Sequence, residues 1–322
     1  MTRIERILLR SAPIAFLLRK SKNWIVPGFR GLPVYDVVGF FLKQVNKLGL
    51  NERAAAISFN LIMALPAAVL FLFSLLPYLP QPDKLELQIL ALFKDISPNS
   101  DTFKFIKNIV DGLLAKHVGV FSFGFILLVF YASNAMMGII RTFDKSIHEN
   151  KKIFLYKRWR AIRLTLILIV LVLISTVLLL LGRTQLIYLL KHVFNLQKET
   201  RVSWWNATRW LIIVALLYYG IAFIYKFAPS VKKRWNLLSP GSILATILTL
   251  TTTILFSYWV NNFASYNKVY GSIGTVLIIM LLIYINSLIL LIGFELNVSI
   301  TYLTKEAEER SWKEIASQGE SF

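Results

Sequence analysis

The sequence contains no cysteine and little charge, and each of these deficits removes a class of protein. Without cysteine there is no disulfide, thiol nucleophile, iron–sulfur cluster or cysteine-ligated zinc site. Charged residues make up 16% of the 322 residues, against roughly 25% in globular proteins. A water-soluble core of this length would therefore lack a polar surface. A hydrophobic content of 56% and a mean hydropathy of +0.61 exclude an intrinsically disordered chain.

Groups suited to enzyme chemistry are also scarce. The histidines, His117, His148 and His192, lie far apart in the segments between the apolar runs, so they do not suggest a shared site. A ribonuclease needs a histidine pair or metal-binding acids, and an intramembrane serine protease needs a histidine within a span. No G-x-x-x-x-G-K-S/T phosphate loop occurs, which argues against ATP as the energy source. We therefore predict no enzymatic activity, catalytic residue, metal or cofactor.

The sequence does contain six long stretches without charge. A membrane crossing needs about 20 apolar residues to span a hydrocarbon core of about 30 Å. The stretches are continuously apolar rather than alternating, which favours helices over a β-barrel. The predicted fold class is all-α: a polytopic membrane protein with six transmembrane helices, an interfacial N-terminal helix and a helical periplasmic loop. The predicted spans are residues 54–80, 118–140, 162–183, 204–227, 240–263 and 273–303.

Two segments outside the spans have helical periodicity. In residues 34–48 apolar positions recur at helical spacing with Lys43 and Lys47 off the stripe, so the segment either lies in the membrane interface or packs against the bundle. The loop 80–117 predicts a small amphipathic helix that covers the outer mouth of the bundle. The resulting organisation is a cytoplasmic and interfacial N-terminal segment (1–53), a membrane domain (54–303) and a cytoplasmic tail (304–322).

Basic residues are distributed unevenly between the two sides of the predicted membrane domain. Of the 36 Lys and Arg residues, 25 lie in the N-terminal segment, in residues 141–163 and 226–239, and in the tail. The other 11 lie in residues 80–117 and 183–209 and at Lys268. Because cytoplasmic loops carry the excess of Lys and Arg, both termini are predicted to be cytoplasmic. This distribution also explains most of the net charge of +19 without a nucleic acid partner.

Four groups of residues resemble one known family. They are Arg53-Ala54-Ala55-Ala56-Ile57-Ser58-Phe59 with Ala64-Leu65-Pro66; Tyr131-Ala132-Ser133-Asn134 with Ile140-Arg141-Thr142-Phe143-Asp144; Pro229, Trp235 and Pro240-Gly241-Ser242; and Tyr258, Phe263, Tyr266 and Tyr270-Gly271-Ser272-Ile273-Gly274, ending in Leu291-Ile292-Gly293-Phe294-Glu295-Leu296-Asn297. With these motifs the chain resembles the YihY/BrkB family of bacterial inner-membrane proteins. The resemblance implies a location in the inner (plasma) membrane; family members have carried virulence, ribonuclease and transporter labels. Phe59-Asn60 and Asp144 depart from the residues that are common in the family.

Glu295 is the only acid within the six predicted spans. An ionisable group is costly to bury in a membrane, so it is a functional candidate by default. Tyr284, eleven residues earlier, lies about 20° from the same helix face at 100° per residue. Glu295 is therefore either a proton or cation site, or a polar gate, or one half of a structural ion pair. Arg53, which maps to the same side of the membrane, is the candidate partner for that pair.

Two further sets of polar residues are predicted to face the interior of the bundle. Asn60 and Asn134 lie within the first and second spans, where an amide must find hydrogen-bond partners. Their role is either structural hydrogen bonding or part of a transport path. Hydroxyl side chains recur at helical spacing in the fifth span, and they either line a hydrated path or mediate close helix packing. They are Ser242, Thr246, Thr249 and Thr253.

A basic segment precedes the fifth span. Ser239 and Pro240 form a favourable helix start, with the serine as N-cap and the proline at the first helical position. An anionic lipid headgroup could bind at this positive dipole end among Lys232, Lys233 and Arg234. The alternative is ordinary positive-inside charge. The expected partners are the lipid bilayer and anionic lipids at the cytoplasmic face, with no nucleic acid.

These residues together favour a transporter or lipid-handling permease. The basis is a polar interior surface in a bundle that has no catalytic group. The alternatives are a non-transporting envelope scaffold or resistance factor and, least favoured, a membrane-bound ribonuclease. A continuous water-accessible cavity along the hydroxyl face would favour transport, whereas a dry and tightly packed bundle would favour the scaffold.

Overall fold

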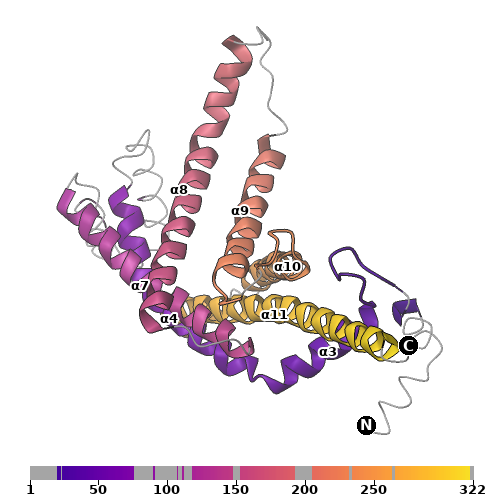
Figure 1. Cartoon of the computed structure of the whole chain (residues 1–322). Helices are drawn as coiled ribbons and strands as arrows, with labels where there is room; N and C mark the ends of the chain where they lie inside the picture. The colour runs from indigo at the N-terminus through magenta and orange to yellow at the C-terminus, as the bar shows by residue number, and fades with distance from the viewer. Residues whose placement is uncertain are drawn as a thin grey trace. The chain divides into compact units, whose positions relative to one another are not determined.

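The computed structural model describes residues 20–22, 24–75, 118–147, 153–192, 205–231, 234–262 and 265–319, and the single residues 90, 107 and 111. The rest of the loop 80–117, with its predicted helix, lies outside the described residues, as do Lys232 and Lys233. Secondary structure in the described part is helical, apart from an isolated bridge between Ile25 and Pro33. Figure 1 labels α3 (Val34–Lys47), α4 (Leu50–Leu75), α7 (Val118–Ser146), α8 (Phe154–His192), α9 (Trp205–Phe227), α10 (Pro240–Asn262) and α11 (Ser265–Gly319).

Six of these helices are long and apolar enough to cross a membrane, which confirms the predicted all-α fold class with six spans. Between 17% and 44% of each apolar window is buried within the protein. Most of the remaining apolar side chains therefore face outward, where hydrocarbon would solvate them. The candidate spans that contain these windows are Leu50–Leu75, Ser122–Ser146, Phe154–Thr176, Thr208–Phe227, Pro240–Trp259 and Val276–Lys313.

The last helix is much longer than a membrane crossing. α11 has 55 residues, which at about 1.5 Å per residue gives roughly 80 Å, against about 30 Å for the hydrocarbon core. Its polar end carries two ion pairs, and the residues of each pair stand four apart, about one helical turn. They are Lys305–Glu309 at 3.8 Å and Arg310–Glu306 at 2.6 Å. The helix thus runs without a break from the last predicted span into the predicted tail.

The chain divides into two compact units. The first comprises Met1–Ala55, Arg141–Lys151 and Ile221–Phe322, and the second comprises Ala56–Ile140 and Lys152–Gly220. These boundaries fall inside α4, α7 and α9 and follow packing rather than membrane crossing. The organisation into an N-terminal segment, a membrane domain and a tail stays a prediction.

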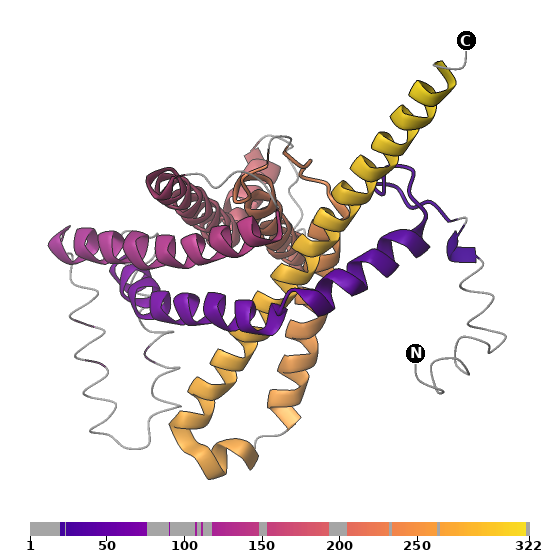
Figure 2. The same cartoon turned by 60° about the horizontal axis from the view of Figure 1, so that its bottom comes forward.

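In the first unit α3 packs along α11, as Figure 2 shows. Val37 of α3 is fully buried and clusters with Leu296 and Ile300 of α11. The ring of Phe40 stacks on that of Tyr302, with 5.0 Å between the ring centroids. Of the two alternatives for residues 34–48, packing against the bundle is therefore present on this side of α3. A position in the membrane interface stays a prediction for its exposed side.

In the second unit α4 and α7 pack through small and aromatic side chains. Ala67, Phe71 and Leu128 form a buried cluster. The rings of Phe71 and Phe125 lie 5.6 Å apart. Gly124 suits this approach, because a Cβ at that position would overlap the end of the Leu70 side chain. Small residues at a helix contact are the usual means by which membrane helices approach closely.

Candidate functional site

Glu295 lies in α11 with its side chain fully buried in the first unit. Its Oε1 oxygen accepts a hydrogen bond from the hydroxyl of Ser146, the last residue of α7. That hydroxyl accepts a hydrogen bond of 2.9 Å from the guanidinium of Arg53, in the first turn of α4. The other carboxylate oxygen, Oε2, has no hydrogen-bond partner among the described residues. Side chains of α4 and α7 thus meet a carboxylate of α11 whose second oxygen lacks a hydrogen-bond partner among the described residues.

Ser146 makes this arrangement possible because a hydroxyl both donates and accepts. It links the predicted partners Arg53 and Glu295 into one chain of hydrogen bonds. A guanidinium close to a buried carboxylate offsets part of the cost of removing the charge from water. Sequence reasoning missed Ser146, which stands 149 residues before Glu295 and which no pattern distinguishes from the other serines.

A block of aromatic rings adjoins the carboxylate. Phe294, next to Glu295 in α11, stacks on Phe143 with ring centroids 3.6 Å apart and an interplanar angle of 5°. Phe143 lies one turn before Ser146, so the stack and the hydrogen bond join the same two helices. The rings of Tyr225 and Trp235 lie 6.1 Å and 5.4 Å from that of Phe294. The four rings of this block are buried.

Side chains of the first unit accept hydrogen bonds from backbone amides in the first turn of α10. Asn297 of α11 accepts a hydrogen bond of 2.9 Å from the Gly241 amide through its Oδ1. Its Nδ2 donates to the Ser239 hydroxyl, also at 2.9 Å. The Ser239 hydroxyl caps the Ser242 amide at 3.3 Å. Gly241, Ser239 and Ser242 are all buried. The amides on which the predicted headgroup site relied therefore have partners within the protein.

Arg234 is the described member of the basic trio that was predicted to contact a headgroup. It is exposed, and its guanidinium lies 5.2 Å from the ring centroid of Phe227. Lys232 and Lys233 lie outside the described residues. A headgroup contact by this trio stays a prediction.

Glycine residues bring α10 and α11 into close contact. A Cβ on Gly293 would lie 2.5 Å from the Tyr225 hydroxyl, 2.6 Å from the Gly241 carbonyl oxygen and 2.8 Å from the Ala245 Cβ. The Tyr225 hydroxyl itself donates to the Leu290 carbonyl at 2.7 Å. This contact is a close crossing of backbones, two residues from Glu295.

The hydroxyl side chains of α10 become more exposed with distance from this crossing. Thr246 is buried, Thr249 is half-buried and Thr253 is exposed. Thr246 donates to the Ser242 carbonyl and Thr253 to the Thr249 carbonyl, each at 2.8 Å. The buried end of the face therefore takes part in close packing. At the exposed end, the Thr253 hydroxyl forms its hydrogen bond within α10 itself.

Asn60 and Asn134 belong to the second unit. Asn60 donates from Nδ2 to the Ala56 carbonyl at 2.8 Å. Asn134 accepts from the Arg158 guanidinium at 2.5 Å. Both amides therefore have structural partners. A place in a transport path stays a prediction for each of them.

Tyr284 stands apart from the carboxylate of Glu295 along α11. Eleven residues of helix separate Tyr284 from Glu295, about 16 Å along the axis, and no hydrogen bond joins them in the described part of the chain. The Asn286 Oδ1 atom is buried and has no partner among the described residues. Within the same residues, no group of three or more His, Asp or Glu side chains could hold a metal ion.

Comparison with known proteins identifies relatives over most of the chain. Residues 41–318 match the family model described as Virulence factor BrkB. A Bacillus subtilis (strain 168) protein named ribonuclease-like protein YfkH is 27% identical over 279 residues, which cover 84% of this chain and 99% of that protein. A UPF0761 membrane protein of Tolumonas auensis is 30% identical over 81 residues, 25% of this chain and 27% of its own length.

A third relative has a similar partial match. The UPF0761 membrane protein XCC0860 of Xanthomonas campestris pv. campestris is 28% identical over 120 residues, 36% of this chain and 28% of its own length. No solved structure matches the chain. Because the family match covers most of the sequence and the helices provide six candidate spans, the chain belongs to the virulence factor BrkB family and is a multi-pass membrane protein.

Proposed function

We propose that the protein is a transporter or lipid-handling permease of the bacterial inner membrane, in which Glu295 binds the coupling proton or cation. The observation that carries this proposal is the open Oε2 oxygen of a fully buried carboxylate in a membrane span. An ionisable side chain at such a position is rare and commonly serves an ion pathway. The proposal includes no catalytic reaction.

A purely structural role explains the hydrogen bond at Oε1 of Glu295 but not the unsatisfied Oε2. An anchor would be expected to satisfy both oxygens, because a buried acceptor without a partner costs about 1–3 kcal/mol. Oε1 is satisfied by Ser146, and Oε2 is not. A proton or a small cation on Oε2 would neutralise the charge and occupy the open position. Arg53 and Ser146 would then hold the carboxylate in its ion-free state.

The neighbours of Glu295 also weigh against hydrolysis of RNA. A nuclease places its acid beside a second acid, a metal or a histidine, whereas Glu295 is held by a serine and an arginine. The ribonuclease-like name belongs to the Bacillus subtilis relative. The close packing of α10 against α11 at Gly293 supports a second candidate, a non-transporting envelope scaffold.

Proteoliposomes test the proposal against the scaffold. We expect wild-type protein to carry protons down a valinomycin-driven potential, or to move fluorescent phospholipids between leaflets, above the rate in empty liposomes. Glu295→Gln should lower the proton flux at least about tenfold while it preserves the fold, because a neutral amide neither releases nor binds the proton at neutral pH. Glu306→Gln, in the exposed ion pair of the tail, is the matched control and should keep the wild-type rate.

Two outcomes would contradict the proposal. Wild-type protein that carries neither protons nor lipids would favour the scaffold. A folded Glu295→Gln variant with undiminished proton flux would remove Glu295 from the ion path.

Orientation in the membrane is a separate prediction, made from the distribution of basic residues. The chain has no cysteine, so single cysteines can be introduced at the exposed positions Lys107 and Lys305. In spheroplasts a membrane-impermeant maleimide should label Lys107→Cys and should label Lys305→Cys only after lysis. The reverse pattern would place both termini outside the cytoplasm.

A further inference from the structure

Exposed apolar side chains gather in the N-terminal segment, outside the candidate membrane spans. Most of the large apolar residues that are exposed in the described part of the chain belong to those spans, where lipid would solvate them. Residues 24–42 lie in no candidate span, yet five large apolar side chains among them are exposed. We call these five the N-terminal apolar surface. They are Trp24, Ile25, Tyr35, Val38 and Leu42, at 58%, 56%, 42%, 41% and 53% exposure.

A short hairpin joins the first two of these residues to the start of α3. The Val34 amide donates to the Trp24 carbonyl at 3.0 Å, and Ile25 pairs with Pro33. Phe29, within the hairpin, is buried in a cluster with side chains of α3 and α11. Trp24 and Ile25 therefore lie beside the first turn of α3, in a hairpin that the helical periodicity of the sequence did not reveal.

α3 has three sides, which follow from a rotation of about 100° per residue. Val37 marks the side that packs on α11. Val38, Leu42 and Tyr35 stand about 100–160° from Val37 around the helix and form one exposed apolar side, whereas Lys43 stands at about 240°. A helix with a packed side, a free apolar side and a charged side fits the boundary between a bilayer and water.

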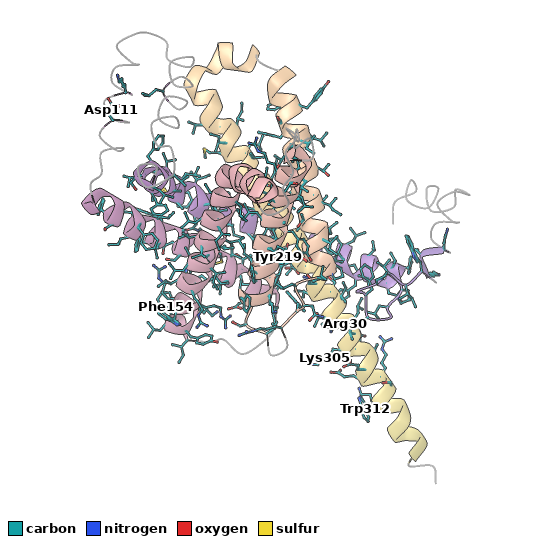
Figure 3. All side chains as sticks on the ribbon, turned by 90° about the horizontal axis from the view of Figure 1, so that it is seen from above. Arg30, Asp111, Phe154, Tyr219, Lys305 and Trp312 are labelled. Atoms are coloured by element: carbon teal, nitrogen blue, oxygen red, sulfur yellow. The ribbon has the colours of Figure 1, made fainter. Side chains whose placement is uncertain are left out.

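The hairpin and α3 pack on α11 where its apolar run ends. Leu296, Ile300 and Leu303 of α11 belong to this contact, and Lys305 is the first charged residue after them. Figure 3, which labels Arg30 of the hairpin and Lys305, shows both residues at this part of α11. Because a spanning helix leaves the hydrocarbon where its apolar run ends, the N-terminal apolar surface lies at the level of the bilayer boundary.

The charge around this surface distinguishes between possible occupants. Residues 20–48 contain five basic residues and one acid, Asp36, and the Lys22 ammonium lies 5.2 Å from the ring centroid of Tyr35. A second copy of the chain would bring the same positive charge to the contact, which disfavours it. Lipid headgroups on an anionic leaflet attract such a segment, and Trp24 and Tyr35 are residue types enriched at the membrane boundary.

We propose that the N-terminal apolar surface binds a lipid surface, by insertion into the headgroup and upper acyl layer of one bilayer leaflet. Val38, Leu42 and Tyr35 contact the acyl chains there, and Lys43 lies on the aqueous side of α3. The proposal assigns the inserted side of the segment and adds the hairpin to it. It is independent of Glu295, so it does not rest on the proposed transport function.

Fluorescence quenching in proteoliposomes tests this placement. Because the chain has no cysteine, a single environment-sensitive NBD label can be attached to full-length protein at Leu42→Cys, with the neighbouring Lys43→Cys as matched control. Vesicles contain phosphatidylcholine and phosphatidylglycerol in equal amounts. A phospholipid with a shallow doxyl group should quench the Leu42→Cys label at least about threefold more than the control label, because an inserted face reaches ~5–10 Å into the leaflet. Iodide in the water should quench the two labels in the reverse order.

Two further positions keep the test independent of a single variant. Val38→Cys on α3 and Trp24→Cys in the hairpin should follow Leu42→Cys with both quenchers. All three side chains are exposed, so the labels leave the packed side of α3 intact, and size-exclusion chromatography checks the fold of each variant. If Leu42→Cys misfolds, the comparison of Val38→Cys with Lys43→Cys decides.

The proposal is overturned if iodide quenches the label at Leu42→Cys as strongly as the label at Lys43→Cys, because the surface would then lie in water. It is also overturned if the Leu42→Cys label is shielded from both quenchers. In that case a crosslink between two copies through this cysteine would identify a contact between copies. Neither result bears on proton flux through Glu295, which is measured separately.

Discussion

Gly293→Ala is expected to destabilise the protein by about 3 kcal/mol, at the upper end of the range for overpacked cores. The added Cβ would lie within 2.8 Å of three groups from two neighbouring segments, and one of them is the Gly241 backbone carbonyl. A side-chain tip can rotate away from a new methyl group, whereas a backbone carbonyl moves only if its helix moves. The variant should therefore separate α10 from α11.

Thermal unfolding in detergent, followed by size-exclusion chromatography, measures this effect. The matched control is Gly39→Ala in α3, where a Cβ would meet nothing within 4 Å. Because alanine is the better helix former by about 1 kcal/mol, the control should unfold at the same temperature as wild-type protein or slightly higher. A Gly293→Ala protein with the wild-type unfolding temperature would mean that the two helices do not cross at this glycine.

The crossing matters for the site because it sets the position of α11. Membrane helices gain no hydrophobic driving force from leaving lipid, so close packing of small residues carries much of their association. Gly293 is two residues from Glu295, and Asn297, two residues beyond, holds the first turn of α10. Loss of the crossing should therefore also disturb the hydrogen bond between Ser146 and Glu295.

The spans could be predicted from the sequence because hydrocarbon excludes charge along every crossing helix. Hydropathy places the end of the last predicted span at residue 303, because it detects the membrane rather than the helix. Beyond residue 303 the helix continues to Gly319, supported by charge pairs such as Arg310–Glu306. Glu295 was predictable for the same reason as the spans: a single acid in an apolar run stands out.

The partners of Glu295 were less accessible to sequence reasoning. Arg53 followed from its side of the membrane, but Ser146 is an ordinary serine whose role depends on how α7 and α11 pack. Depth in the membrane did not reveal the hydrogen-bond partners of Asn60 and Asn134, which are the Ala56 carbonyl and the Arg158 guanidinium. The hydroxyl face of α10 was visible as a pattern. Which part of it is buried depends on the Gly241–Gly293 crossing, and spacing alone does not reveal that crossing.

Ser146→Ala is expected to destabilise the protein by about 3 kcal/mol, because it leaves a buried carboxylate without its donor. The hydrogen bond from Arg53 to Ser146 disappears with it. Ser299→Ala is the matched control: Ser299 is equally buried, but its hydroxyl donates to the Glu295 backbone carbonyl rather than to the carboxylate. A hydroxyl bonded within its own helix contributes little, so this variant should lose about 1 kcal/mol or less.

A double-mutant cycle then separates the carboxylate from its surroundings. In a Glu295→Leu background no buried charge remains, so Ser146→Ala should cost only a fraction of what it costs in wild-type protein. Arg53→Ala should resemble Ser146→Ala in wild-type protein and should likewise cost less in the Glu295→Leu background. If Ser146→Ala has the same effect in both backgrounds, the serine acts through packing alone and the three residues do not form one unit. If the coupling is present and Glu295→Gln folds normally but carries no protons, the same carboxylate serves both as the structural junction of α4, α7 and α11 and as the ion site.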